Sequence, residues 1–258
     1  MSTTDDSPTP PSFDRPLVEV TVSAPAAEVW RALREPAKIR DWFGWETDSL
    51  GEEIDYIFLE HAQADDAARV LRFGLGDRFE VIDHGSTCVV RVVRPAPTAD
   101  SDWDDVFEDM TQGWIAFAQQ LAFAFDRHRG AQRRTLYLAG SPQREGGALA
   151  AAALGLVQRS LRPGDAYAPV VVGDETLTGT LWHRGNHQLG VTVQGWGDGL
   201  LVILDRPAND RWPHGGSQAI LTTYGLDDAA FEALRTRWTA WWEAQLGPSL
   251  DRGGSSCG

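Results

Sequence analysis

A stripe of large apolar side chains at helical spacing is the feature that most constrains this chain. Steps of four, three, four, three, four and four residues separate its members, which are Trp103, Phe107, Met110, Trp114, Phe117, Leu121 and Phe125. This spacing predicts a long amphipathic helix over residues 103–125. Aspartates at the start of the helix suit the positive end of its dipole, and Arg127 and Arg129 suit the negative end. Gly130 is typical of a residue that ends a helix. Such a helix must bury its stripe, so the rest of the chain has to supply an apolar surface.

A similar stripe returns 124 residues later. The closing helix predicted at residues 227–246 carries Phe231, Leu234, Trp238, Trp241 and Gln245, and four of these five positions are large and apolar like their counterparts in the first stripe. This repeat predicts two similar domains at residues 17–130 and 131–247, with a disordered leader at 1–16 and a flexible tail at 248–258. The alternative is one domain with an unrelated extension, because the strands of the two halves align only with shifting offsets.

Strand-like segments precede each closing helix. In the first half, the alternation of LVEVTV predicts a strand at 17–22, a short helix follows, and four β-rich runs predict an antiparallel meander at 54–60, 69–75, 78–83 and 87–93. Turns are expected at 74–77 and 83–86. In the second half we expect strands at 134–139, 177–182, 189–193 and 200–204, and an Ala-rich helix at 145–160.

The charge of the chain is acidic and unevenly distributed. Of 258 residues, 37 are acidic and 23 are basic, a net charge of −14, and residues 1–130 alone hold 25 of the acidic and 12 of the basic side chains. A general field for binding nucleic acid is therefore excluded. The acidic first half is interpreted as a solvated surface, with a docking site for a basic partner as the alternative.

Cysteine content and hydropathy indicate the cellular compartment of the protein. The two cysteines, Cys88 and Cys257, form no disulfide framework, the first dozen residues lack the features of a signal peptide, and no apolar stretch is long enough to span a bilayer. These observations predict a cytoplasmic protein with no membrane span.

No residue pattern indicates a catalytic, metal or cofactor site. His183 and His187 have a spacing that suits a metal on a helix, but the sequence WHRGNHQ around them is typical of a hairpin turn. The Gly-rich segment 195–199 joins two predicted strands, so it presents no helix N-terminus to a phosphate. Paired acids such as Glu52 and Glu53 are interpreted as solvated. We therefore expect no catalytic residue, no metal and no cofactor.

Three segments of the first half carry a family resemblance. VEVTVSAPAAEVWRAL at 18–33, EPAKIRDWFGW at 35–45 and the Gly113–Trp114 pair in a helix that ends in HRG resemble the START-like, helix-grip (SRPBCC) superfamily, and most closely the bacterial relatives of the heat-shock-protein-90 ATPase activator. In the second half the resemblance rests on residues 197–204 and 223–242, without the WF segment. It implies an α+β fold of two domains, each a curved antiparallel sheet around a long C-terminal helix.

A high aromatic content, 11 Trp and 10 Phe, suggests a cavity for a ring-containing ligand, although aromatic side chains also fill cores. The candidate ligand-binding residues are Trp42, Phe43, Trp45, Phe58, Phe73, Trp114, Phe117, Leu121, Trp182, Trp196, Trp238 and Trp241. The leading hypothesis is a non-enzymatic binding protein for a small hydrophobic or aromatic ligand or a protein partner, and the resemblance implies a stress- or chaperone-related setting.

Two further functions follow from the resemblance. Two-domain START-like proteins include polyketide aromatase/cyclases, which need polar groups aimed into the cavity, and Tyr56, His61, Arg72 and Arg91 are the candidates for that role. Co-chaperone activity through the surface of the first half is the other alternative.

Overall fold

Two antiparallel sheets with the same strand order build the molecule. The structure is a computed structural model and describes residues 16–74, 76–95, 104–209 and 212–248. Most of the predicted leader and most of the tail, together with Trp103 and Cys257, lie outside these residues, while Pro16 begins β1.

The first unit runs from β1 to α4. Its elements are β1 (Pro16–Val22), α1 (Ala26–Ala32), α2 (Pro36–Ile39), α3 (Leu50–Ile54), the π-helix η1 (Asp55–Glu60), β2 (Gln63–Asp65), β3 (Val70–Arg72), β4 (Arg78–Asp83), β5 (Cys88–Val93) and α4 (Asp104–Arg127). The sheet order is β1-β5-β4-β3-β2, so the first strand pairs with the last. The register includes Val20 opposite Val90.

The second unit runs from β6 to α6. Its elements are β6 (Arg133–Gly140), α5 (Ala150–Ala153), β7 (Val170–Val172), β8 (Glu175–Leu177), β9 (Leu181–Arg184), β10 (Gln188–Val193), the 3-10 turn η2 (Gln194–Trp196), β11 (Gly199–Arg206), β12 (Gly216–Tyr224) and α6 (Asp228–Leu246). The order β6-β12-β11-β10-β9 repeats that of the first sheet, and β7 and β8 form a separate hairpin. A sheet whose first and last strands pair, closed by a long C-terminal helix, is the helix-grip arrangement, and the chain contains it twice.

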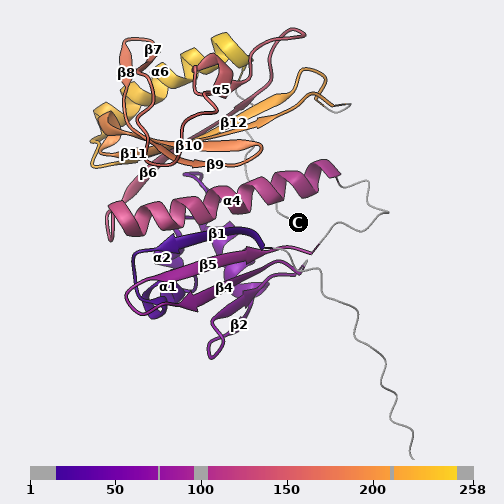
Figure 1. The fold of residues 1–258 in the computed structure, drawn as a ribbon, viewed down its shortest axis with the longest axis vertical. Helices are drawn as coiled ribbons and strands as arrows, with labels where there is room; N and C mark the ends of the chain where they lie inside the picture. The colour runs from indigo at the N-terminus through magenta and orange to yellow at the C-terminus, as the bar shows by residue number, and fades with distance from the viewer. Residues whose placement is uncertain (1–15, 75, 96–103, 210–211, 249–258) are drawn as a thin grey trace, which may run out of the picture.

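The layers alternate between sheet and helix. Figure 1 shows the first sheet, α4, the second sheet and α6 stacked in that order. One buried apolar cluster joins α4 to the first sheet and also to Val202 and Ile220 on the near face of the second sheet. A second cluster joins the opposite face of that sheet to Trp238 and Trp242 of α6. Helix α4 therefore buries two faces, one against each sheet.

Both closing helices confirm the predicted periodicity, with one shift in register. In α4, Trp114, Phe117 and Leu121 are buried as expected. In α6 the buried stripe is Phe231, Leu234, Trp238, Trp242 and Leu246. The predicted end of that stripe was wrong, because Trp241 is only half-buried and Gln245 is exposed. Successive steps of four residues after Leu234 rotate the buried face by one position.

Two helix and strand predictions are wrong for identifiable reasons. Residues 54–60, predicted as a strand, form the end of α3 and η1. Their apolar residues fit both patterns, since Ile54 and Phe58 are spaced for a strand face as well as for a helix face. The helix predicted at 145–160 is limited to Ala150–Ala153, because Gly146 and Gly155 adopt positive φ angles of 71° and 69° that a helix does not allow.

Smaller corrections concern the second sheet. The run at 177–182 is divided between the end of β8 and the start of β9, and Trp196 lies in η2, within the segment that joins β10 and β11. The segment containing His183 and His187 forms the predicted hairpin of β9 and β10. Across the described ranges, no helix is both long enough and apolar enough to cross a membrane.

Candidate ligand-binding site

Aromatic rings from several elements meet between α4 and the first sheet. We call them the ring cluster, which consists of Trp42, Phe43, Phe58, Phe73, Phe79, Trp114 and Phe117. Centroids of neighbouring rings lie 4.7 Å apart for Phe43 and Phe117, 4.9 Å for Phe43 and Phe58, and 5.1 Å for Phe73 and Trp114. All but Phe79 were predicted as ligand-binding residues, so the structure brings most of the first-half candidates together. The rings pack against one another at distances typical of aromatic contacts.

A buried polar group closes the ring cluster at one end. The guanidinium of Arg94 donates hydrogen bonds to Asp77 Oδ1 at 2.8 Å and to Thr111 Oγ1 at 2.9 Å, and the Trp114 indole N–H donates to Asp77 Oδ2 at 2.9 Å. The Arg94 and Asp77 side chains are only 6% and 3% exposed. Sequence reasoning missed both residues, because Asp77 lay in a predicted turn. The one sequence feature that pointed to this group was the position of Arg94, directly after the apolar run of β5.

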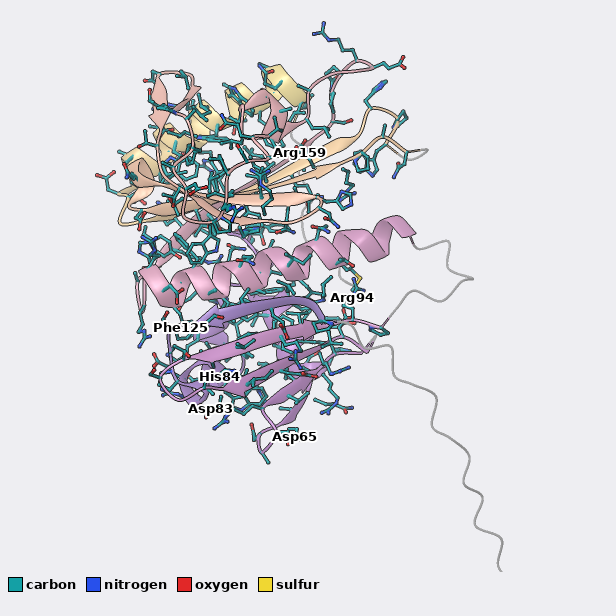
Figure 2. The ribbon with its side chains drawn as sticks, viewed as in Figure 1. Asp65, Asp83, His84, Arg94, Phe125 and Arg159 are labelled. Atoms are coloured by element: carbon teal, nitrogen blue, oxygen red, sulfur yellow. The ribbon has the colours of Figure 1, made fainter. Side chains whose placement is uncertain are left out.

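A cleft of about 130 Å³ opens near the other end of α4. Figure 2 labels Arg94 and Phe125, which lie toward opposite ends of the helix. Helices α1 and α2, the end of α4 and the segment after α2 form the walls, and the lining residues are Glu28, Ala32, Lys38, Asp41, Trp42, Leu121, Ala124, Phe125, His128, Arg129 and Gly130.

Trp42 lies between the cleft and the other rings of the ring cluster. Its centroid is 5.7 Å from that of Phe58, and its indole N–H donates to the carbonyl of Ala32 at 2.9 Å. The side chain is 1% exposed. Trp42 therefore belongs to both features, and the apolar floor of the cleft is continuous with the aromatic interior of the first unit.

Most charged groups around the cleft already have partners. Arg129 donates to the carbonyl of Ser23 and lies 3.5 Å from Glu28. His128 Nε2 is 2.8 Å from the carbonyl oxygen of Asp198, and its ring stacks on Tyr224 with centroids 3.6 Å apart.

Asp41 differs from these groups. In the described part of the chain its carboxylate has no hydrogen bond or ion pair. Burial raises the pKa of this carboxyl group, against the smaller, lowering effects of Arg133 and Lys38.

Arg133 at the start of β6 holds the segment that carries Asp41 and Trp42. It donates to the carbonyls of Arg40 at 2.8 Å, Phe43 and Gly44, and to Gln120 Oε1 at 2.8 Å. Burial lowers the pKa of this guanidinium to about 10. The arginine fixes one wall of the cleft from the second unit, a role that nothing in the local sequence indicated.

The remaining predicted residues lie in three separate places. Trp45 stacks on Tyr137 of the second unit, with centroids 3.9 Å apart. Trp238 and Trp241 belong to α6, and the Trp238 ring centroid lies 5.4 Å from that of Trp196 and 5.8 Å from that of Trp241. Trp182 packs on Phe123 of α4, on the other face of the second sheet. The twelve candidates therefore do not form one site.

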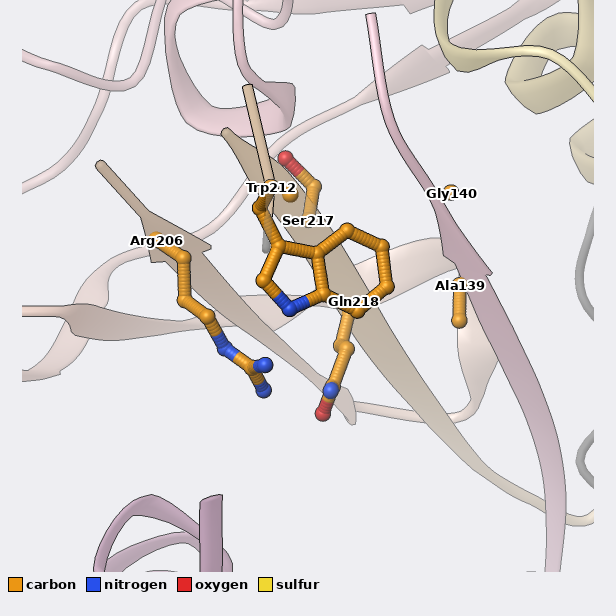
Figure 3. A pocket seen from close by; sticks show the side chains of 7 residues that line it. Ala139, Gly140, Arg206, Trp212, Ser217 and Gln218 are labelled. Carbon is orange, nitrogen blue, oxygen red and sulfur yellow. The ribbon is translucent and has the colours of Figure 1, made fainter. Parts of the chain in front are cut away.

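A second hollow lies on the second unit. Figure 3 shows Arg206, Trp212 and Gln218 around it, with the Arg206 guanidinium 5.7 Å from the Trp212 ring centroid. Its volume is about 10 Å³. That space suits about one water molecule, so the cleft of the first unit is the better candidate for a ligand.

The four residues proposed for an aromatase/cyclase reaction do not converge on the ring cluster. Tyr56 is 47% exposed, with its ring beside His61, and Arg72 is exposed. Arg91 forms ion pairs with Glu19 and Glu80 on the open face of the first sheet. Within the described residues, no three His, Cys, Asp or Glu side chains form a group able to hold a metal ion.

Comparison with known proteins yields solved structures only, since no family model and no curated protein matches. DynU16, a putative protein in the dynemicin biosynthetic locus, is 18% identical over 89% of this chain and 95% of its own, with a TM-score of 0.28. The di-domain ARO/CYC BexL from the BE-7585A biosynthetic pathway is 14% identical over 89% and 95%, with a TM-score of 0.34. The di-domain ARO/CYC StfQ from the steffimycin biosynthetic pathway is 10% identical over 88% and 93%, with a TM-score of 0.32. At these identities and TM-scores, no activity of these proteins is assigned to the chain. The narrower resemblance to the ATPase activator stays a prediction.

Proposed function

We propose that the chain is a binding protein for a small hydrophobic or aromatic ligand, which it takes up in the cleft of the first unit. The observation that carries the proposal is that the cleft ends on Trp42, and through it on the ring cluster. Pockets for small molecules combine an apolar, aromatic lining with a few polar groups, and this cleft has both.

The volume of the cleft indicates the size of the ligand. An apolar cavity of about 150 Å³ accommodates benzene, so about 130 Å³ suits a compound built on a single ring. A larger ligand requires rings of the cluster to move.

Binding without a chemical step is the function that these groups support best. The two buried ionic groups beside the rings, Asp77 and Arg94, are paired with each other. An aromatase/cyclase reaction, the alternative, needs an acid or base that faces the ligand. The four candidates for that role lie outside the ring cluster. Of the titratable groups that line the cleft, His128 is held by the Asp198 carbonyl and the Tyr224 ring, which leaves Asp41 to bind a ligand.

The experiment is a titration with indole and phenol, followed by calorimetry, on the wild type and on Ala124→Leu. Ala124 lines the cleft, so a larger side chain there fills the space without changing a charge. We expect binding to weaken at least tenfold in Ala124→Leu. It should be unchanged in Ala240→Leu, a matched substitution at an exposed position of α6. Circular dichroism checks that both variants remain folded, and equal binding by folded Ala124→Leu and wild type would refute the site.

A further inference from the structure

Asp41 is the charged group of the cleft that the protein itself does not pair. Glu28 lies beside Arg129, and Lys38 lies 3.9 Å from Glu35. Asp41 has no such partner in the described residues, although it lines the cleft and is partly buried. A carboxylate partly withdrawn from water loses part of its hydration, and a hydrogen-bond donor from a bound molecule would replace that interaction.

The buried cation that acts on Asp41 is already bound by other groups. Arg133 acts on its charge, but the hydrogen bonds of this guanidinium go to the Arg40, Phe43 and Gly44 carbonyls and to Gln120. A guanidinium held by four acceptors is fixed in position. Asp41 lines the cleft, so its carboxylate keeps acceptor capacity that a ligand there can use.

The floor beside Asp41 is apolar. Trp42, Leu121 and Phe125 line the cleft together with two alanines. A molecule that fits has an apolar ring and a head group that donates hydrogen bonds. The charged side chains that line the cleft balance, with Glu28 and Asp41 against Lys38 and Arg129, so no excess of positive charge opposes an ammonium group there.

We propose that the ligand of the cleft is a small protonated amine with one ring, whose ammonium group binds Asp41 and whose ring packs on Trp42, Leu121 and Phe125. This inference rests on the proposed function, because it names the chemical class of the same ligand. An anion is disfavoured although Lys38 and Arg129 line the cleft, since Arg129 donates to Ser23 and pairs with Glu28, and Lys38 lies near Glu35.

Three matched ligands test the head group. N,N-dimethyl-2-phenylethylamine, 2-phenylethanol and 3-phenylpropionate carry the same ring with a positive, neutral and negative head at pH 7. We expect calorimetry to give at least tenfold tighter binding for the amine than for the alcohol. Asp41→Asn should bring the two ligands to within about twofold, while Asp48→Asn, the same change at an exposed position outside the cleft, should keep the preference.

The single lysine of the sequence maps the position of the ligand. Lys38 lines the cleft. Acetylation of the native protein followed by peptide mass mapping measures the extent of modification at Lys38 separately from that at the N-terminal amine. The tertiary amine does not consume the reagent and should slow acetylation of Lys38 at least threefold. Unchanged acetylation under saturating amine would overturn the placement in the cleft.

The outcomes separate the two proposals. Equal binding of amine and alcohol, or tightest binding of the carboxylate, overturns the assignment of the head group and leaves the proposed function intact. Failure of all three ligands, together with indole and phenol, overturns both. The comparison of amine with alcohol on the wild type keeps the test decisive if Asp41→Asn does not fold.

Discussion

The two sheets differ in how many of their faces are covered. In the first sheet, Phe79 and Val81 of β4 face the interior, while Glu80 lies on an open face and pairs with arginines. In the second sheet, Val202 of β11 packs toward α4 and Leu201 packs toward α6. One unit thus has a solvated outer surface, and the other has a sheet buried on both sides.

This difference can be read in the residue patterns. RFEVID in β4 alternates between buried and half-buried positions, whereas the GLLVIL portion of β11 is buried throughout. Alternation is typical of a sheet with one face in water, and a continuous apolar run is typical of a sheet with both faces covered. The residue pattern therefore indicates whether one or both faces of a strand are covered, in addition to predicting the strand itself.

The largest expected effect comes from placing a charge on the face of each sheet that points away from its own closing helix. Val202→Asp puts a carboxylate beneath α4, where Val202 is 2% exposed, and should lower the free energy of unfolding by about 4 kcal/mol or more. Ile82→Asp on the half-exposed side of β4 should cost about 1 kcal/mol. Urea unfolding measures both, and similar costs would show that α4 does not cover the second sheet.

A smaller effect concerns pH. His183 lies on the α4 side of the second sheet, where its Nε2 is 3.1 Å from Gln188 Oε1 and Gln188 donates to the Gln112 carbonyl of α4. Burial lowers the pKa of His183 to about 4, from about 6.5. The unfolded chain therefore binds more protons between these values, so stability present above pH 6.5 is lost as the pH falls toward 4.

The variant His183→Gln isolates this contribution. Between pH 7 and 4.5 the wild type should lose about 2 to 3 kcal/mol more stability than the variant, since one pKa unit corresponds to about 1.4 kcal/mol. Carboxyl groups titrate in both proteins and cancel in the difference. Parallel urea midpoints across this range would contradict a neutral, buried His183.

The smallest expected effect compares two buried tryptophans. Trp114 donates its indole hydrogen to Asp77, whereas the indole nitrogen of Trp238 has no hydrogen-bond partner. Both Trp114→Phe and Trp238→Phe remove similar volume, but only the first leaves a buried carboxylate short of a donor. We expect Trp114→Phe to cost about 1 to 2 kcal/mol more in urea unfolding. A larger loss for Trp238→Phe would reverse the comparison.

The sequence predicted the fold well because periodicity is a local property. The stripes of α4 and α6 and the alternation in β1 and β4 can each be read within a dozen residues, and the predicted segments match these elements closely. Local patterns failed where they were ambiguous, as in residues 54–60, whose apolar spacing fits a helix and a strand equally well.

The site was predicted only in part, because its parts come from distant segments. The aromatic residues of the sequence indicated the ring cluster, because exposing a large apolar ring to water is unfavourable and such residues are therefore expected to be buried. The unpaired state of Asp41 depends on Arg133, whose hydrogen bonds go to residues 13 to 93 positions away. A single sequence gives no sign of such a contact.

The position of α4 between two sheets has a consequence for synthesis on the ribosome. The first unit is complete once α4 has emerged, yet Val202 and Ile220, which cover the second face of α4, are made 75 and 93 residues after Arg127. At a synthesis rate of about 5 to 20 residues per second, this apolar face of α4 stays exposed for roughly 4 to 20 s before the second sheet can pack on it. The nascent chain is most exposed to aggregation in that interval.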